Sequence, residues 1–187
     1  ASPGTALGSY EIEVGQLASA QKQASAGFAD AEATVGSGQL SFSSGSGSFN
    51  VDVLATDSLA AIRDKINNAT DNDSVRASIL NVDDGAGGTE ARLVLSSAQT
   101  GSDGAVTVTA TDDDGNATDA AGLSRLASNN LQELAAAQDA QITVDGLDVT
   151  SSSNTLDGVV QGLTLDLQSA EPGTKVTAGV EADNSPV

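Results

Sequence analysis

The chain has 187 residues, 26 of them acidic and 7 basic, so its formal net charge at pH 7 is -19. Cys and His are absent, which excludes disulfides, thiol chemistry, His-containing catalytic triads and the usual zinc sites. Phosphate binding needs clustered Lys and Arg, so neither nucleic acid nor an anionic membrane surface is expected as a partner. With one Tyr, three Phe and no Trp, any core must be built mainly from Val, Leu, Ile and Ala.

Apolar and polar residues alternate along most of the chain, beginning with Tyr10, Ile12 and Val14. This period of two places one face of a strand on a core and the other in water, which is typical of antiparallel sheets. Asp145-Gly146 lies between two short apolar runs and predicts a tight hairpin turn. Strands are predicted in chain order at 10–14, 49–53, 75–82, 91–96, 106–110, 142–144, 147–150, 163–167 and 176–180.

The segment 57–69 breaks this alternation. Its apolar residues recur three or four positions apart, which predicts about three helical turns with one apolar face. Asp57 or Ser58 can cap the first turn. The residues that carry the pattern are Leu59, Ile62, Ile66 and Ala69, of which the first three are expected in the core, and Asn67 and Asn68, which are expected to cap the end of the helix.

Three further segments have weaker helical patterns. A second, shorter helical turn is predicted from Asn154 or Thr155 through Leu156 to Gly162. The segments 16–26 and 131–138 are rich in Ala and Gln and also compatible with helix. The predicted fold class is therefore mainly β, a β-rich α+β arrangement of small antiparallel domains with one or two short helices.

Candidate chemistry is sparse. Without His or Cys, the many Ser residues are interpreted as surface and turn residues, and close carboxylate pairs arise by chance among so many acids. The acidic run 112–116 superficially resembles a calcium loop, but an EF-hand needs Gly where Ala117 stands and an acid where Leu123 stands. We therefore expect no enzyme activity, no catalytic residue, no metal site and no cofactor.

The segment 57–69 resembles the short Ile-Asn signature shared by flagellins and flagellar hook-associated proteins. Other blocks resemble one branch of these proteins more closely, namely the filament cap family called hook-associated protein 2. They occur along the chain in the order found in that family. The block with Asn154, Thr155 and Leu156 and the Gly-Leu-Thr-Leu run after it are the most specific of them. The resembling blocks are 8–18, 36–42 with 49–53, 137–146, 152–159 and 162–167.

The resemblance implies that the chain is a fragment. Cap proteins carry terminal coiled-coil helices, whereas neither end of this chain has a sustained heptad pattern, and the start at Ala1–Gly4 reads as a cut. The chain should then correspond to the β-rich head domains. The family architecture implies one domain built from 1–36 plus 132–187, with a second domain, 37–131, inserted in it and carrying the Ile-Asn helix.

The implied function is architectural. A cap protein forms a plate at the distal tip of the extracellular filament and promotes flagellin polymerisation, without covalent chemistry. Implied partners are further copies of itself in a ring-forming homo-oligomer, flagellin, neighbouring hook-associated proteins and, for an adhesive cap, host surface glycans. Export is implied through the flagellar type III pathway without a cleaved signal peptide. Two alternatives stay open: another axial protein, such as a flagellin outer domain or a hook–filament junction protein, and a surface adhesin or carbohydrate-binding β-domain.

Overall fold

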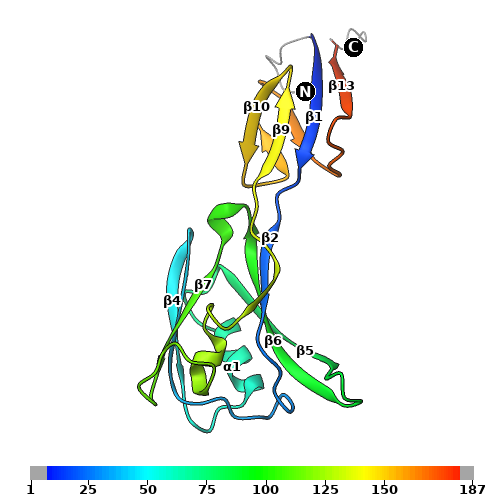
Figure 1. Cartoon of the computed structure of the whole chain (residues 1–187). Helices are drawn as coiled ribbons and strands as arrows, with labels where there is room; N and C mark the ends of the chain where they lie inside the picture. The colour runs from blue at the N-terminus through cyan, green and yellow to red at the C-terminus, as the bar shows by residue number, and fades with distance from the viewer. Residues whose placement is uncertain (1–7, 182–187) are drawn as a thin grey trace, which may run out of the picture. The chain divides into compact units, whose positions relative to one another are not determined.

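The computed structural model describes residues 8–181, and Figure 1 traces their elements along the chain. Contacts between backbone positions divide these residues into two compact units. Unit 1 contains residues 8–19, 100–102 and 138–181, and unit 2 contains residues 20–99 and 103–137. The start at Ala1–Gly4, which was interpreted as a cut, lies outside the described residues.

Unit 1 is built from antiparallel strands. Its larger sheet has the order β10-β9-β1-β13, and a separate pair joins β11 to β12. The β9–β10 hairpin turns at Asp145 and Gly146, whose φ angles of 51° and 80° are the positive values that a tight turn requires there. The bounds are β1 (Gly8–Gln16), β9 (Ala140–Val144), β10 (Leu147–Ser151), β11 (Thr155–Asp157), β12 (Thr164–Asp166) and β13 (Lys175–Val180).

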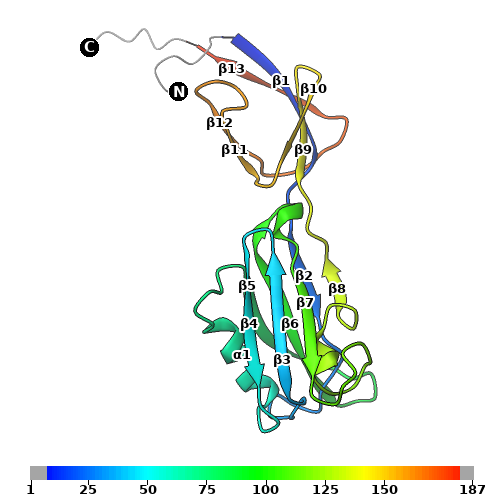
Figure 2. The ribbon, with the colours of Figure 1, turned by 90° about the vertical axis from the view of Figure 1, so that its left-hand side faces the viewer.

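Unit 2 contains two sheets and a helix. One sheet has the order β5-β6-β2-β8, and the other has the order β4-β3-β7 (Figure 2). The strands are β2 (Ala20–Ala24), β3 (Gly38–Ser44), β4 (Gly47–Val53), β5 (Val75–Asp83), β6 (Thr89–Thr100), β7 (Thr107–Asp112) and β8 (Gln132–Ala135). The helix is α1 (Leu59–Asn67), and the short 3-10 helices are η1 (Ser102–Gly104) and η2 (Gly122–Leu126).

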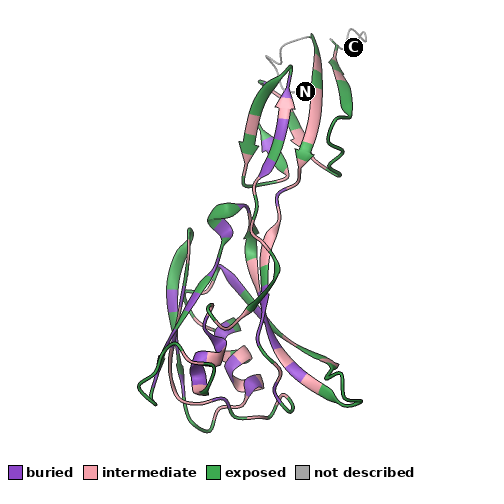
Figure 3. Ribbon diagram, viewed as in Figure 1, coloured by how far each residue is buried: buried purple, intermediate pink, exposed green. Residues whose placement is uncertain are grey.

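The core of unit 2 combines side chains of both sheets with one face of α1. In Figure 3, buried positions recur along the strands and on α1. Along β4, for example, Phe49, Val51 and Val53 are buried while the residues between them are exposed. The rings of Phe42 and Phe49, opposite one another on β3 and β4, stack with centroids 4.7 Å apart. Alternation along each strand thus supplies the apolar surface whose burial stabilises the unit.

The core of unit 1 is smaller. Its buried members are Ile142, Val144, Leu156 and Val160, around which residues of β1, β10 and β12 are only partly buried. Leu147 in β10 and Val176 in β13 remain 72% and 63% exposed. Unit 1 therefore has few side chains that are fully removed from water.

The structure contains each predicted strand and the main helix. The helix is shorter than the predicted 57–69, and Ser58 is its N-cap, accepting a hydrogen bond from the Ala61 N–H at 3.2 Å. The three weaker helical predictions are wrong. Residues 154–162 contain β11 and a bend, 16–26 contain β2, and 131–138 contain β8. Ladder pairing with neighbouring strands outweighs the modest helical preference of these segments.

The two units differ in their boundaries from the division that the family resemblance implies. Residues 20–36 and 132–137 pack with unit 2, because β2 lies between β6 and β8 in one sheet. Residues 100–102 pack with unit 1, since the Thr100 hydroxyl donates to the Ser152 carbonyl at 2.6 Å. The resemblance implied a first domain of two pieces, and unit 1 also includes this three-residue piece.

Candidate functional site

The apolar half of the Ile-Asn motif lies in the core. Leu59, Ile62 and Ile66 occupy one face of α1, and each has an exposed fraction of 0%. Their spacing aligns them on that face because an α-helix turns once in 3.6 residues. Fully enclosed side chains cannot contact a partner, so this half of the motif holds α1 in unit 2.

Asn67, the last residue of α1, binds the neighbouring strand β5. Its carboxamide oxygen accepts from the Ala77 N–H, and its carboxamide nitrogen donates to the Ala77 carbonyl, both at 2.8 Å. The side chain thus takes the place of an adjacent strand for one residue of β5. A carboxamide carries an acceptor and a donor on two separate atoms, whereas a carboxylate only accepts, an ammonium group only donates, and a hydroxyl offers both on a single oxygen. We call this pairing the Asn67 clamp.

Two further Asn residues complete the end of the helix. Asn68 is the C-cap residue, and both its backbone N–H and its side-chain amide donate to the Asp64 carbonyl. Asn72 donates to the carbonyls of Ile66 and Val75 and accepts from the Val75 N–H. Sequence reasoning missed Asn72, although an Asn between a helix and a strand is a common turn former.

Asn154 forms the same arrangement in unit 1. Its carboxamide oxygen accepts from the Ala18 N–H at 2.7 Å, and its nitrogen donates to the Ala18 carbonyl at 2.9 Å. Thr155 donates its hydroxyl hydrogen to the Asp166 carboxylate at 2.8 Å, and Leu156 is 3% exposed in the core. We call the pairing with Ala18 the Asn154 clamp. The candidate residues therefore form two separate anchors, one inside each unit.

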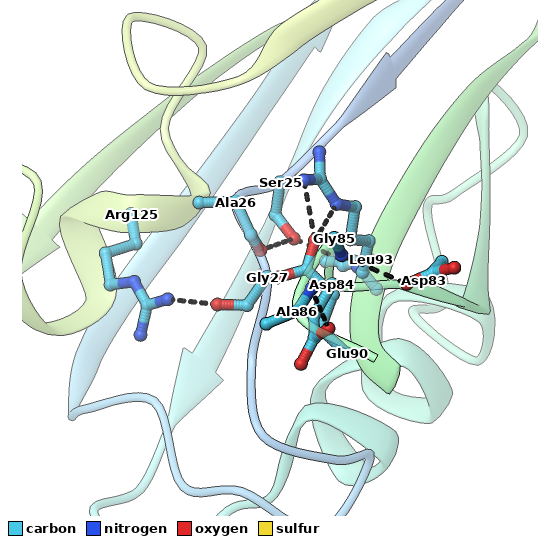
Figure 4. A network of polar contacts seen from close by, with 11 residues as sticks. Ser25, Ala26, Gly27, Asp83, Asp84, Gly85, Ala86, Glu90, Leu93 and Arg125 are labelled. Atoms are coloured by element: carbon cyan, nitrogen blue, oxygen red, sulfur yellow. Dashed lines mark hydrogen bonds and ion pairs between the residues drawn. The ribbon is translucent and has the colours of Figure 1, made fainter. Parts of the chain in front are cut away.

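A third anchor, which sequence reasoning missed, lies where residues 25–28 run beside β6 (Figure 4). The Ser25 N–H donates to the Leu93 carbonyl at 2.8 Å, and the Leu93 N–H donates to the Ser25 hydroxyl oxygen at 3.0 Å. Phe28 and Ala91 exchange two backbone bonds of 2.8 Å. This segment continues the pairing of β2 with β6 beyond the end of β2.

Arg125 and Gly27 close this anchor. The Arg125 guanidinium donates to the Gly27 carbonyl at 2.7 Å and lies 3.8 Å from the centroid of the Phe28 ring, a cation–π contact. The Glu90 carboxylate, paired with Arg92 at 2.6 Å, lies so close to Gly27 that an added Cβ would be 1.7 Å from it. Only a residue without a side chain fits there in this arrangement. A lone Gly or Arg gave no pattern from which this packing could be predicted.

The acidic turns act as backbone acceptors. Asp112, 8% exposed, accepts from the Ser124 N–H at 2.8 Å and so ties the end of β7 to η2. Asp84, in the β5–β6 turn, accepts from the N–H groups of Ala86 and Gly88, and these bonds lower the pKa of its carboxyl. Among residues 8–181, no three His, Cys, Asp or Glu side chains gather closely enough to hold a metal ion.

Asp57 also has a structural role. It accepts from the Leu54 N–H at 2.7 Å and forms an ion pair with Lys65 of α1. The hydrogen bond from Lys65, followed by that from Leu54, lowers the pKa of the Asp57 carboxyl.

Among the described residues, no helix is both long and apolar enough to cross a membrane.

Comparison with known proteins identifies the family. Residues 137–187 match the family model described as "Flagellar hook-associated protein 2 C-terminus", and residues 39–99 match "Flagellin hook IN motif". A crystal structure of the D2-D3 domains of the flagellar cap protein FliD from Escherichia coli superposes with a TM-score of 0.81 at 31% identity. The match covers 97% of this chain and 92% of that one. The chain belongs to the FliD family, flagellar hook-associated protein 2.

Other FliD proteins extend the comparison. FliD (HAP2) from Pseudomonas aeruginosa PAO1 has a TM-score of 0.82 at 31% identity, over 98% of this chain and 84% of that one. The A-type flagellar hook-associated protein 2 of Pseudomonas aeruginosa is 31% identical over 202 residues, and the flagellar hook-associated protein 2 of Aeromonas caviae is 34% identical over 163 residues. The alignments span 40% and 32% of the length of these two relatives.

The Ile-Asn motif, which lies in the segment that matches the flagellin hook IN model, now has a structural explanation. The helix face of Ile62 and Ile66 anchors α1 in the core, and the Asn67 clamp joins the end of α1 to β5. The relatives are described as hook-associated and cap proteins, a structural family. The motif in this chain accordingly positions the scaffold of unit 2.

Proposed function

We propose that this chain is the β-rich head region of a flagellar filament cap. In this proposal it lies outside the cell at the distal tip of the filament, forms a plate with further copies of itself, and promotes flagellin polymerisation. The observation that carries the proposal is the match to the FliD D2-D3 domains across 92% of their length. The C-terminal family model favours this reading over a flagellin or junction protein, because the Ile-Asn motif alone is described for flagellin as well.

The role is inferred to be mechanical. The motif residues support the scaffold, and the acidic turns bind their own backbone, so these features provide architecture rather than reaction chemistry. The partners proposed are further copies of the chain, flagellin and neighbouring hook-associated proteins. Secretion through the flagellar export pathway follows from that location.

The high negative charge fits a surface that must release its neighbours. With 26 acidic and 7 basic residues, copies of the chain repel one another at long range, so contacts in a ring would be replaceable and sensitive to salt. We expect higher salt to strengthen association of the full-length protein. Association that is equally strong at low and high salt would contradict this explanation of the charge.

Immunogold electron microscopy of intact flagella tests the location. An antibody raised against this chain is expected to label only the distal ends of filaments, and antibody preadsorbed with the purified chain serves as the control. Label along the shaft or at the hook junction would assign the protein to another axial class. Label confined to the cell body would instead support an adhesin.

A further inference from the structure

The four outer strands of the two sheets in unit 2 differ in how their free edges are covered. An uncovered edge presents a row of backbone donors and acceptors on which another strand can assemble, so proteins usually block such edges. The Asn67 clamp and Asn72 cover the first part of β5. Ser128 covers β7, since it donates to the Val108 carbonyl at 2.9 Å and its hydroxyl accepts from the Val108 N–H at 2.8 Å. β8 is exposed but only four residues long.

Among the described residues, the outer edge of β4 is uncovered over most of its length, as is that of β5 beyond Ala77. The hairpin pair Ser44–Gly47 closes a two-residue turn and must therefore be hydrogen-bonded, so the backbone groups of Ser48, Asn50 and Asp52 point away from β3. Lys65 donates to the Asp52 carbonyl at 3.0 Å. Within residues 8–181, the outward N–H and C=O groups of Ser48 and Asn50 have no hydrogen-bond partner.

A groove runs along this edge. The loop that follows α1, residues 68–73, forms the opposite wall, and two hollows of about 460 and 430 Å³ lie between the loop and β4. The first hollow reaches from Phe49 to Asp52, and the second lies beside Ser46–Ser48. Together they follow the strand, and they leave space beside the unpaired backbone groups. In Figure 2, β4 lies at the outer side of its sheet, next to β3.

The charged side chains that line the groove indicate what kind of partner it can bind. Asp52, Asp71 and Asp73 line it, against the single cation Lys65, which is already paired with Asp57. A second copy of this chain, itself strongly acidic, would meet like charge. We propose that β4 and this groove bind an extended basic peptide segment as an added strand, with backbone bonds to Ser48 and Asn50 and with Lys or Arg side chains beside Asp71 and Asp73.

The probe is a short dye-labelled peptide in which Lys alternates with Val, titrated into the 187-residue chain and followed by fluorescence anisotropy. Its control is the same peptide methylated on alternate backbone nitrogens, which keeps the charge but removes the donors that strand addition requires. Strand addition predicts at least about tenfold weaker binding of the methylated peptide, because several backbone hydrogen bonds are lost. Hydrogen exchange should slow at the Ser48 and Asn50 amides when the unmethylated peptide binds.

Two protein variants separate the backbone from the charge contribution. Asn50→Pro removes one outward N–H, as edge strands tolerate, without removing a bond to β3, and is expected to weaken binding about fivefold or more. Asp71→Asn combined with Asp73→Asn should weaken binding several-fold at low salt. The matched control, Glu32→Gln with Asp113→Asn, changes two exposed carboxylates outside the groove and should bind like the parent.

Some outcomes would overturn the proposal. Equal affinity for both peptides, or no binding, would show that β4 does not accept a strand, independently of how Asn50→Pro folds. If the chain without peptide dimerises in sedimentation experiments and thereby protects the Ser48 and Asn50 amides, the occupant is a second copy and the basic peptide is excluded. Neither result affects the location experiment, so this inference and the cap proposal are tested separately.

Discussion

Units 1 and 2 are both built mainly from antiparallel strands, but they differ in how many apolar side chains they bury. Among the described residues, the core cluster of unit 2 has 21 buried apolar residues and that of unit 1 has four, so most side chains of unit 1 keep some contact with water. Because apolar burial is the main favourable contribution to folding, unit 2 should be the more stable unit. Unit 1 depends relatively more on directed polar anchors such as the Asn154 clamp.

The largest expected effect comes from truncating one core residue in each unit. Ile62→Ala in α1 should destabilise unit 2 by about 3–5 kcal/mol, since a fully enclosed site cannot collapse around the missing atoms. Ile142→Ala in β9 should cost unit 1 less, about 2–3 kcal/mol, because its partly exposed neighbours can close the gap. Urea unfolding followed by amide signals from each unit separates the two values. A larger loss for Ile142→Ala would reverse our interpretation of the cores.

The same contrast decides what the sequence could predict. Where a strand has one buried and one exposed face, as at Phe49–Val53, alternation predicted it correctly. The helix face of Leu59, Ile62 and Ile66 and the turn at Asp145-Gly146 were also correctly predicted, because each is encoded within a few residues. The fold class, mainly β with a short helix, followed from these local patterns.

Predictions failed where pairing with distant segments determines the conformation. β2 and β8 contain Ala and Gln without a clear apolar face, and they are strands because they pair with each other beside β6. The spacing of Leu156, Val159 and Val160 imitates a helix, yet the segment begins as β11 paired with β12. The clamps could not be predicted from the sequence either, since Asn154 and its partner Ala18 are 136 positions apart.

The clamps give the second prediction. Replacing Asn67 by Ala leaves both backbone groups of Ala77 unpaired, and Ala77 is only 7% exposed, so unit 2 should lose about 2–3 kcal/mol. Asn154→Ala should cost unit 1 a similar amount at Ala18, which would be a larger fraction of its stability. Amide exchange at Ala77 and Ala18 measures each loss directly.

A matched control for the clamps is available in β5. Asn81 is exposed, and its replacement by Ala should change stability by no more than about 0.5 kcal/mol. Asn67→Asp should destabilise unit 2 nearly as much as Asn67→Ala, because a carboxylate cannot donate to the Ala77 carbonyl. If Asn67→Asp retained full stability, the paired donor and acceptor would not be the reason for Asn at this position.

The third prediction compares a glycine at which an added Cβ would overlap a neighbouring side chain with a glycine that has open space around it. Gly27→Ala should destabilise unit 2 by about 1–2 kcal/mol, since the new methyl group overlaps the Glu90 carboxylate. Gly179→Ala in β13 meets no atom within 4 Å and should be nearly neutral in unit 1. Adding Glu90→Ala to Gly27→Ala should recover most of the loss in a thermal melt. No recovery would mean that the overlap with Glu90 is not the cause of the destabilisation.

The smallest effect expected is a difference between the units in their response to pH. In unit 2, Lys65 lowers the pKa of Asp57 below its ordinary value of 3.8. The stability that this ionised carboxylate contributes is therefore complete above about pH 4 and is lost as the pH falls through the lowered pKa. In unit 1, Glu11 raises the pKa of Lys175 above 10.5, so the contribution of that pair is complete below this pH and is lost as the pH rises through the raised pKa.

Each dependence can be isolated as the difference between the parent chain and one variant. Asp57→Asn should reduce the acid sensitivity of unit 2 below about pH 4 and leave unit 1 unchanged, whereas Lys175→Gln should act only on unit 1 above about pH 10. The Lys175 difference should be smaller and should vanish in concentrated salt, because its ion pair with Glu11 is exposed, while only 12% of the Asp57 side chain is accessible. Melting curves of both units, recorded across the two pH ranges, measure these differences. Acid sensitivity that persists unchanged in Asp57→Asn would assign it to other carboxylates of unit 2 and remove Asp57 as its cause.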